Sequence, residues 1–296
     1  MSLRVAVVSR NPQMRLAAAT AFDKAPSDWT VELHDTVPED ADVVVFGPDI
    51  EADAGVRFDP TQPDRLLEDV IAAWQQRGSA VVVTSAGGGT GTTSLSLHLA
   101  LARASTIPTC WLDLNAGSHS GDRLGLRGSS LKSWGDIDAS ETAMRMAALP
   151  VAGGFRVLLA PPRESSVDVS AVVERACCEF QRVVIDVAAG SLLEIVLARA
   201  GAAVVVMSPT LGCARKTKAL LDEFPGAPWV VVTNRIGPGG ESTKTALQRI
   251  IGRRITMELP CAPALRDCED EGRLLKSAWS PWRRAVTRLA KALEQA

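Results

Sequence analysis

A glycine-rich stretch between an apolar strand and a helix carries the clearest chemical signal in this sequence. The expected strand covers Ala80–Thr84, and shortly after it the chain reads Gly87-Gly88-Gly89-Thr90-Gly91-Thr92-Thr93-Ser94. Glycines let a backbone approach a phosphate closely, and the N–H groups at the start of a helix point toward the bound anion. We therefore predict an anion-binding loop here rather than a plain strand-to-helix turn.

The spacing of this loop excludes one nucleotide-binding template and partly fits another. The dinucleotide template G-x-G-x-x-G fails, because its last glycine falls on Thr92 or Ser94 depending on the starting position. The phosphate-loop template G-x-x-x-x-G-K-[ST] places its second glycine on Gly91 and its hydroxyl on Thr93, but its lysine on Thr92. The loop therefore keeps the backbone that holds phosphate and lacks the cation.

The elements that must position this loop form a repeated strand-then-helix pattern. Near-continuous Val, Ile and Leu runs are typical of strands that are covered on both faces. The expected strands cover 80–84, 109–114, 156–160, 182–187, 203–207, 229–233 and 254–258. Residues 79–296 are therefore predicted to form an α/β domain with a doubly wound, mainly parallel sheet.

The residues before this domain read as a short α/β segment and a connector. Residues 1–56 contain three expected strands (5–8, 31–33 and 42–46) and a helix at 12–22. Residues 57–78 are predicted to be a linker, with two prolines in four residues, followed by an amphipathic helix that ends at Gly78.

Composition and charge exclude several broad classes of protein. The chain has 296 residues, with 32 Lys and Arg against 34 Asp and Glu, so its formal net charge of −2 argues against a general nucleic-acid coat. No apolar run reaches the roughly 18 residues of a membrane span, and the N-terminus lacks signal-peptide features. The six cysteines form no C-x-x-C pair, which indicates small buried thiols in a reducing compartment. We expect a cytoplasmic protein.

The motifs along the chain resemble those of the MinD/ParA family of P-loop ATPases. Their loop reads K-G-G-x-G-K-T-T, so Gly87 and Thr92 replace both of its lysines, including the signature lysine that reaches across the family's dimer interface. The resemblance implies further site residues: Asp113 and Asn115 at the catalytic switch I segment, Thr93 and Asp186 as Mg²⁺ ligands, and Asn234 at the adenine base. The aspartate that positions water in the family is Asn115 here. Binding of ATP or ADP with Mg²⁺ is therefore expected to be weak or lost.

Within that family the sequence is most similar to the CpaE/TadZ branch, including its actinobacterial CpaE-like or septum-site-determining members. The stretch from Asp113 to Gly117 and the following 121–126 carry this similarity. It implies a localisation or regulatory protein for pilus or secretion-machine assembly or septum placement, with pilus, secretion or cell-division partners and a homodimer. No specific nucleic acid is expected, and recruitment would be to the pole, septum or inner membrane surface. The alternative is an active ATPase that takes its cation from Arg215 or Lys216.

The two ends of the chain allow further predictions. The N-terminal segment resembles a truncated receiver domain, but Ser9-Arg10-Asn11 stands where receivers have an acidic pair, and Asp49 is a poor candidate for a phosphoacceptor.

A C-terminal helix is expected after its N-cap, Ser280. Its basic, amphipathic sequence could contact a membrane at most peripherally, and we expect its apolar stripe to pack on the domain core. His98 is expected to be structural.

Overall fold

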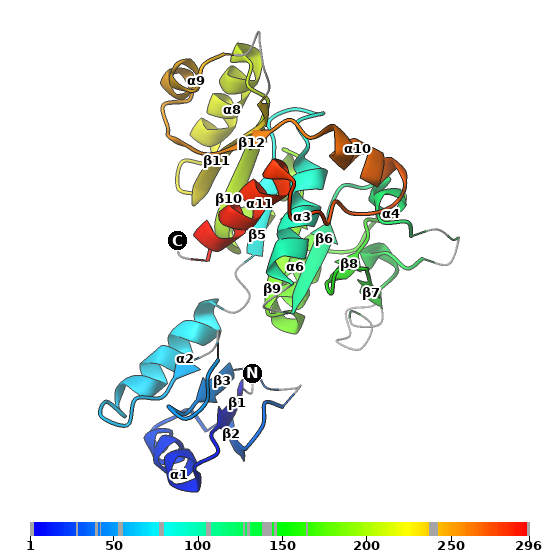
Figure 1. Ribbon diagram of the computed structural model, residues 1–296. Coiled ribbons are helices and arrows are strands. Elements are labelled where there is room, and N and C mark those ends of the chain that lie inside the picture. The colour runs from blue at the N-terminus through cyan, green and yellow to red at the C-terminus, as the bar shows by residue number, and fades with distance from the viewer. Residues whose placement is uncertain are drawn as a thin grey trace. The chain divides into compact units, whose positions relative to one another are not determined.

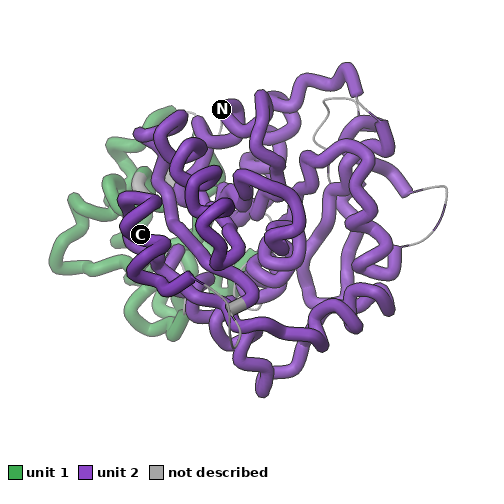
Figure 2. The backbone as a smooth tube through the Cα atoms, turned by 90° about the horizontal axis from the view of Figure 1, so that it is seen from above, with its two compact units in different colours: residues 1–77 green, residues 78–296 purple. Residues whose placement is uncertain are grey.

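The chain divides into two compact units, residues 1–77 and 78–296 (Figure 2). The computed structural model describes residues 3–27, 29–38, 41, 43–52, 56–76, 80–104, 108–126, 128, 131–137, 144, 147–163, 165–236 and 242–294. Gly78, where we expected the connecting helix to end, lies outside the described residues. Each unit is described separately below.

The N-terminal unit is a parallel four-stranded sheet with two helices (Figure 1). Its elements are β1 (Leu3–Val8), α1 (Pro12–Ala21), β2 (Trp29–His34), β3 (Val43–Phe46), β4 (Val56–Arg57) and α2 (Arg65–Gln76), and the strand order is β2-β1-β3-β4. The three expected strands and the first helix are present. The two-residue strand β4 was not expected, because it is too short to show a hydrophobic period.

Helix α2 belongs to the N-terminal unit rather than acting as a free connector. Its Leu66 and Val70 are buried and share a hydrophobic core with Val5 of β1 and Val45 of β3. The i, i+4 spacing of these two side chains places them on one helix face, which the sheet then covers. Helix α2, which lies within the segment 57–78 expected as a linker and connecting helix, therefore supplies part of the core of this unit.

Asp49 joins the ends of β1 and β3. Its carboxylate accepts hydrogen bonds from Ser9 Oγ (2.6 Å) and from the backbone N–H groups of Arg10 (2.7 Å) and Asn11 (3.2 Å). These bonds, the one from Ser9 first, lower the pKa of the exposed Asp49 carboxyl. A carboxylate with three internal donors serves to hold two loops together.

The C-terminal unit is built on an eight-stranded sheet of order β12-β11-β10-β5-β9-β6-β8-β7, in which only β7 runs antiparallel to its neighbour. The strands are β5 (Ala80–Thr84), β6 (Thr109–Asp113), β7 (Leu149–Pro150), β8 (Arg156–Leu158), β9 (Arg182–Asp186), β10 (Ala200–Met207), β11 (Trp229–Ile236) and β12 (Ile255–Pro260). The helices are α3 (Thr92–Arg103), α4 (Ser120–Arg123), α6 (Val169–Glu179), α7 (Ser191–Leu197), α8 (Leu211–Glu223), α9 (Lys244–Ile251), α10 (Pro263–Asp270) and α11 (Pro281–Ala292). The expected α/β fold with a mainly parallel sheet is confirmed.

Alternate residues of the central strands pack on opposite faces of this sheet. Val82 of β5 joins a core with side chains of α6, α7, α8 and α9, whereas Val83 joins a second core with α3 and α11. The side-chain period of two in a strand separates these neighbours. Both faces are therefore covered, which explains why the strands are apolar throughout rather than alternating (Figure 1).

The apolar stripe of α11 packs on the domain core, as expected from the sequence. Trp282, Val286 and Leu289 are at most 1% exposed and lie in the core that α3 also lines. Ser280 is the N-cap of this helix, and its side chain accepts a hydrogen bond from the N–H of Arg283. Among the described residues, no helix has the length and apolar character needed to cross a membrane.

Candidate functional site

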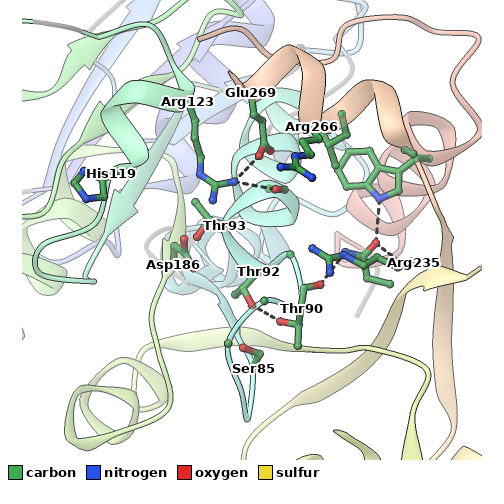
Figure 3. Close-up of a pocket in the computed structure, with 18 of the residues that line it drawn as sticks. Ser85, Thr90, Thr92, Thr93, His119, Arg123, Asp186, Arg235, Arg266 and Glu269 are labelled. Carbon is green, nitrogen blue, oxygen red and sulfur yellow. Dashed lines mark hydrogen bonds and ion pairs between the residues drawn. The ribbon is translucent and has the colours of Figure 1, made fainter. Parts of the chain in front are cut away.

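The glycine loop lies between the end of β5 and the start of α3 and lines a cavity of about 1060 Å³ (Figure 3). Asn115 and Asp186, which lie at the ends of β6 and β9, line the same cavity. Ligands of open parallel sheets bind outside the carboxyl ends of the strands, and this cavity is in that place. The fold therefore puts the loop, and the residues that follow two neighbouring strands, around one space.

Most of the residues predicted for the site meet in this cavity. It is lined by Gly88, Gly89, Thr90, Gly91, Thr92, Thr93, Ser94, Asn115, Asp186 and Asn234. Two predicted residues, Gly87 and Asp113, are not among the lining residues. A Cβ at Gly87 would have the Lys216 Cδ atom as its nearest neighbour, 3.9 Å away, so this position faces α8.

The backbone of the loop depends on glycine at two positions. Gly89 and Gly91 have φ values of +73° and +88°, which L side chains rarely adopt. Gly91 is also the N-cap of α3, so the N–H groups of Thr92 and Thr93 begin the helix at the cavity wall. The Thr90 and Thr92 hydroxyls are hydrogen-bonded to each other (2.9 Å). The arrangement offers backbone donors and the positive end of a helix dipole to an anion.

Asp186 is the buried acid of the site. It is 1% exposed, and its Oδ2 atom has no hydrogen-bond partner among the described residues. Burial, and then the charge of Asp113, raises the pKa of Asp186 to about 7, while the Thr93 and Ser96 hydroxyls oppose this shift. An unpartnered carboxylate oxygen beside a threonine hydroxyl suits Mg²⁺, which prefers oxygen ligands. The residues present therefore fit the predicted metal pair of Thr93 and Asp186.

Asp113 turns inward and fixes the chain that follows β6. Its fully buried carboxylate accepts bonds from the Asn115 N–H (2.9 Å) and from the Ser118 and Ser120 hydroxyls. Burial raises the pKa of Asp113, and these hydrogen bonds oppose the shift. The Trp134 indole also donates to its carbonyl oxygen (2.6 Å). The geometry gives Asp113 a structural role, and its catalytic role stays a prediction.

Asn115 joins the ends of β6 and β9 through both ends of its amide. Its Nδ2 donates to Asp113 Oδ1 (3.1 Å) and to the carbonyl oxygen of Asp186 (3.3 Å). Its Oδ1 accepts from the N–H of Ala188 (2.7 Å). A carboxylate could not make the two donated bonds, so the amide at this position is specifically suited to this structure.

Asn234, predicted to meet an adenine base, is occupied by contacts within the protein. It is 3% exposed, its Nδ2 donates to the carbonyl oxygen of Thr90 (2.8 Å), and its Oδ1 accepts from the Trp282 indole (3.2 Å) and the Arg235 N–H (2.9 Å). These bonds tie the glycine loop to β11 and α11. The base contact stays a prediction.

Sequence reasoning missed several charged residues that line the cavity. Arg123 of α4, Arg235 of β11, and Arg266 and Glu269 of α10 all line it, whereas the suggested cations Arg215 and Lys216 do not. Arg123 lies inside the 121–126 motif, but the residues around it in sequence do not indicate that its side chain faces the cavity. These four residues come from elements far apart in the chain, so only the fold brings them together.

Comparison with known proteins places the fold of this unit. No protein-family model matches the chain, and none of the curated proteins is significantly similar in sequence. Among solved structures, a ParA family ATPase from Chlorobium tepidum superposes with a TM-score of 0.63 at 18% identity, over 72% of this chain and 98% of that one. The MinC:MinD cell division protein complex of Aquifex aeolicus gives 0.63 at 18%, over 74% and 96%.

The cell division ATPase MinD of Pyrococcus furiosus superposes with a TM-score of 0.60 at 20% identity, over 74% of this chain and 99% of that one. The similarity covers these neighbours almost completely. The chain therefore has the fold of the MinD/ParA P-loop ATPases. At these identities the likeness establishes the fold alone.

Proposed function

We propose that the C-terminal unit is a nucleotide-binding positioning protein of the MinD/ParA type, with weak or absent ATP hydrolysis. The observation that carries this proposal is the cavity itself. Its lining includes a glycine loop with helix-start amides and two positive-φ glycines, which supports a phosphate site, while Thr92 supplies a neutral hydroxyl where a lysine is expected. A cation that stabilises the charge of a transferring phosphoryl group is typically worth about 10³- to 10⁵-fold in rate.

The ligand we propose is ATP or ADP with Mg²⁺. Thr93 and Asp186 would hold the metal ion, whose charge would offset that of the phosphates. The unpartnered Oδ2 of Asp186 supports this assignment, because a buried carboxylate oxygen without a partner is costly unless a cation meets it. ATPases with this fold include the septum site-determining protein MinD of Pyrococcus horikoshii in complex with Mg-ADP.

For the cellular role we propose localisation or regulation in the manner of CpaE/TadZ proteins, in pilus or secretion-machine assembly or in septum placement. The sequence similarity around Asp113–Gly117 supports the CpaE-like assignment, and the fold shared with cell-division and partition ATPases supports a positioning role. The N-terminal unit, with its Asp49 bound internally, would then recruit a partner rather than receive phosphate.

A binding titration and a hydrolysis assay test this proposal together. ATP and ADP are titrated into the full chain with and without Mg²⁺, and phosphate release is followed at steady state. We expect weak, Mg²⁺-assisted binding and phosphate release close to the background rate. Turnover at the rate of active MinD-like ATPases would contradict the weak-hydrolysis proposal, and the absence of any binding would contradict the site.

A second function, active ATP hydrolysis with a substitute cation, is favoured by one observation. Arg123 and Arg235 line the cavity and could neutralise phosphate charge. Arg215 and Lys216, the first candidates for such a cation, lie outside the lining residues. The same hydrolysis assay separates the two functions.

A further inference from the structure

Arg123 and Glu269 form an ion pair inside the cavity, although 146 residues separate them in the chain. Arg123 projects from α4, and its Nη1 donates both to Glu269 Oε2 and to Ser94 Oγ (3.3 Å). Figure 3 shows the guanidinium directed into the cavity near Thr93, with the Glu269 carboxylate beside it. A cation therefore already lies at the start of α3, where phosphate would bind.

Glu269 is an unusual group to find in an anion site. It is 9% exposed, lines the cavity, and leaves its buried Oε1 atom without a hydrogen-bond partner among the described residues. A carboxylate here repels an incoming phosphate and occupies the guanidinium that could bind it. The Arg123 guanidinium can therefore pair either with the Glu269 carboxylate or with a bound phosphate.

We propose that Arg123 is the phosphate-binding cation of this site, and that Glu269 is an internal competitor which holds the guanidinium until a polyphosphate displaces it. This inference rests on the proposed nucleotide-binding function. A guanidinium donates charged hydrogen bonds to a carboxylate and to a phosphate alike, so Arg123 can exchange its single bond to Glu269 Oε2 for bonds to a phosphate. The Arg123 side chain is 42% exposed, which leaves it free to turn toward a ligand.

The C-terminal unit also offers a matched control pair outside the cavity. Lys218 and Asp222 of α8 are not among the residues that line it, carry the same charges, and form an exposed ion pair (Nζ to Oδ2, 2.7 Å). The Lys218 side chain is 48% exposed, so water and salt screen its charge. Changes at this pair report the effect of altering one surface charge that the ligand does not contact.

The test is a calorimetric titration with tripolyphosphate and with ADP, without Mg²⁺ and at constant ionic strength. R123Q should weaken binding by about tenfold or more, the usual effect of losing a hydrogen bond to a charged group. R123K keeps the charge and should recover part of the affinity.

E269Q retains the shape of Glu269 and should raise the affinity several-fold, roughly the effect of removing one nearby like charge. K218Q and D222N should each change the affinity by less than about twofold, as expected for an exposed, screened pair outside the cavity.

The double variant R123Q/E269Q decides whether the two residues act as a pair. If Glu269 competes for Arg123, E269Q should give little gain when Arg123 is already absent. Independent, additive effects would overturn the proposed competition. Wild-type binding that R123Q leaves unchanged would overturn the role of Arg123 while the proposed function stands. If neither wild type nor E269Q binds either probe, and ADP still fails to bind when Mg²⁺ is added, the proposed nucleotide site itself is wrong. Urea unfolding of each variant confirms that it is folded.

Discussion

The side-chain amide of Asn234 donates a hydrogen bond of 2.8 Å to the carbonyl oxygen of Thr90, which precedes it by 144 residues. This bond holds the glycine loop against β11, and it leaves no room at Gly91. A Cβ on residue 91 would lie 2.4 Å from Asn234 Nδ2, a distance at which real Cβ atoms are essentially never found. The shape of the loop is therefore fixed by two residues together.

Gly91→Ala should abolish whatever nucleotide binding is measured. The substitution requires a positive φ from an alanine and moves Asn234, and we expect a loss of about 1–3 kcal/mol in the free energy of unfolding. Gly212→Ala is the matched control, since a Cβ there meets nothing within 4 Å and Gly212 is not among the residues that line the cavity. Calorimetric titration and urea unfolding measure both effects. Unchanged nucleotide affinity in the Gly91 variant would contradict the proposed site.

Asn115→Asp should destabilise the protein at neutral pH. The change replaces the donor Nδ2 by an oxygen that faces Asp113 Oδ1 and the carbonyl oxygen of Asp186. Two lost bonds and a like-charge contact should lower the free energy of unfolding by about 2–4 kcal/mol. The loss should shrink as the pH falls and the new carboxyl takes up a proton. Asn115→Ala serves as the uncharged control, and a neutral effect of Asn115→Asp would contradict the structural role of the amide.

Hydrolysis of ATP by the natural protein should be very slow or undetectable. Restoring lysine at Thr92 and at Gly87 tests whether only these cations are missing. A side chain at Gly87 is accommodated, because the nearest atom to its Cβ lies 3.9 Å away. Phosphate release should rise in the double-lysine variant, and adding Asn115→Asp to it tests the carboxylate at that position. Rates equal to those of active MinD-like ATPases before any substitution would show that another cation already completes the site.

Association of the chain with itself should not depend on ATP. Gly87 stands where the MinD/ParA resemblance places the signature lysine that would contact a partner's nucleotide. A ligand shifts an association equilibrium only through unequal contacts with the two states. Sedimentation velocity with and without Mg-ATP should therefore give the same distribution of species. A strong ATP-driven shift from monomer to dimer would show that a different residue supplies the contact.

His98 should make stability fall between neutral and mildly acidic pH. The ring is fully buried, accepts from the Leu275 N–H at Nε2 (3.0 Å), and packs edge-on against Trp282. Burial, and to a lesser degree the charge of Arg283, lowers the pKa of His98 from 6.5 to about 4, against the opposing hydrogen bond to the Ser94 carbonyl. Between these values the unfolded chain binds a proton that the folded protein excludes, so stability is lost as the pH falls.

From pH 7 to pH 5 this effect amounts to about 2 kcal/mol in the free energy of unfolding. The raised pKa of Asp186 acts in the opposite direction over this interval, so urea titrations at both pH values are compared between the natural protein and a variant without His98. The His98→Gln variant lacks the titrating group and should lose correspondingly less stability over the same interval. An identical pH dependence in the two proteins would exclude His98 as its source.

The sequence by itself determined the architecture of the C-terminal unit and the position of its loop. The apolar run of β5 is followed, after Ser85 and Ala86, by glycines and threonines, and this signal lies within about fifteen residues because strand burial and positive φ are local demands. Asp186 was found in the same way, since it directly follows the buried residues of β9. Local patterns of this kind fix which residues meet at one edge of a parallel sheet.

Only the tertiary structure decided which charges face the loop and what the polar residues contact. Arg123 and Glu269 lie on α4 and α10, and nothing near either residue indicates that they pair. Likewise, the sequence of α2 indicates only a connecting helix, and the fold shows that the sheet buries its Leu66 and Val70. Ion pairs and core contacts between distant elements depend on distances that the fold sets. A hydrophobic period can predict an element, but it cannot predict the neighbour against which that element packs.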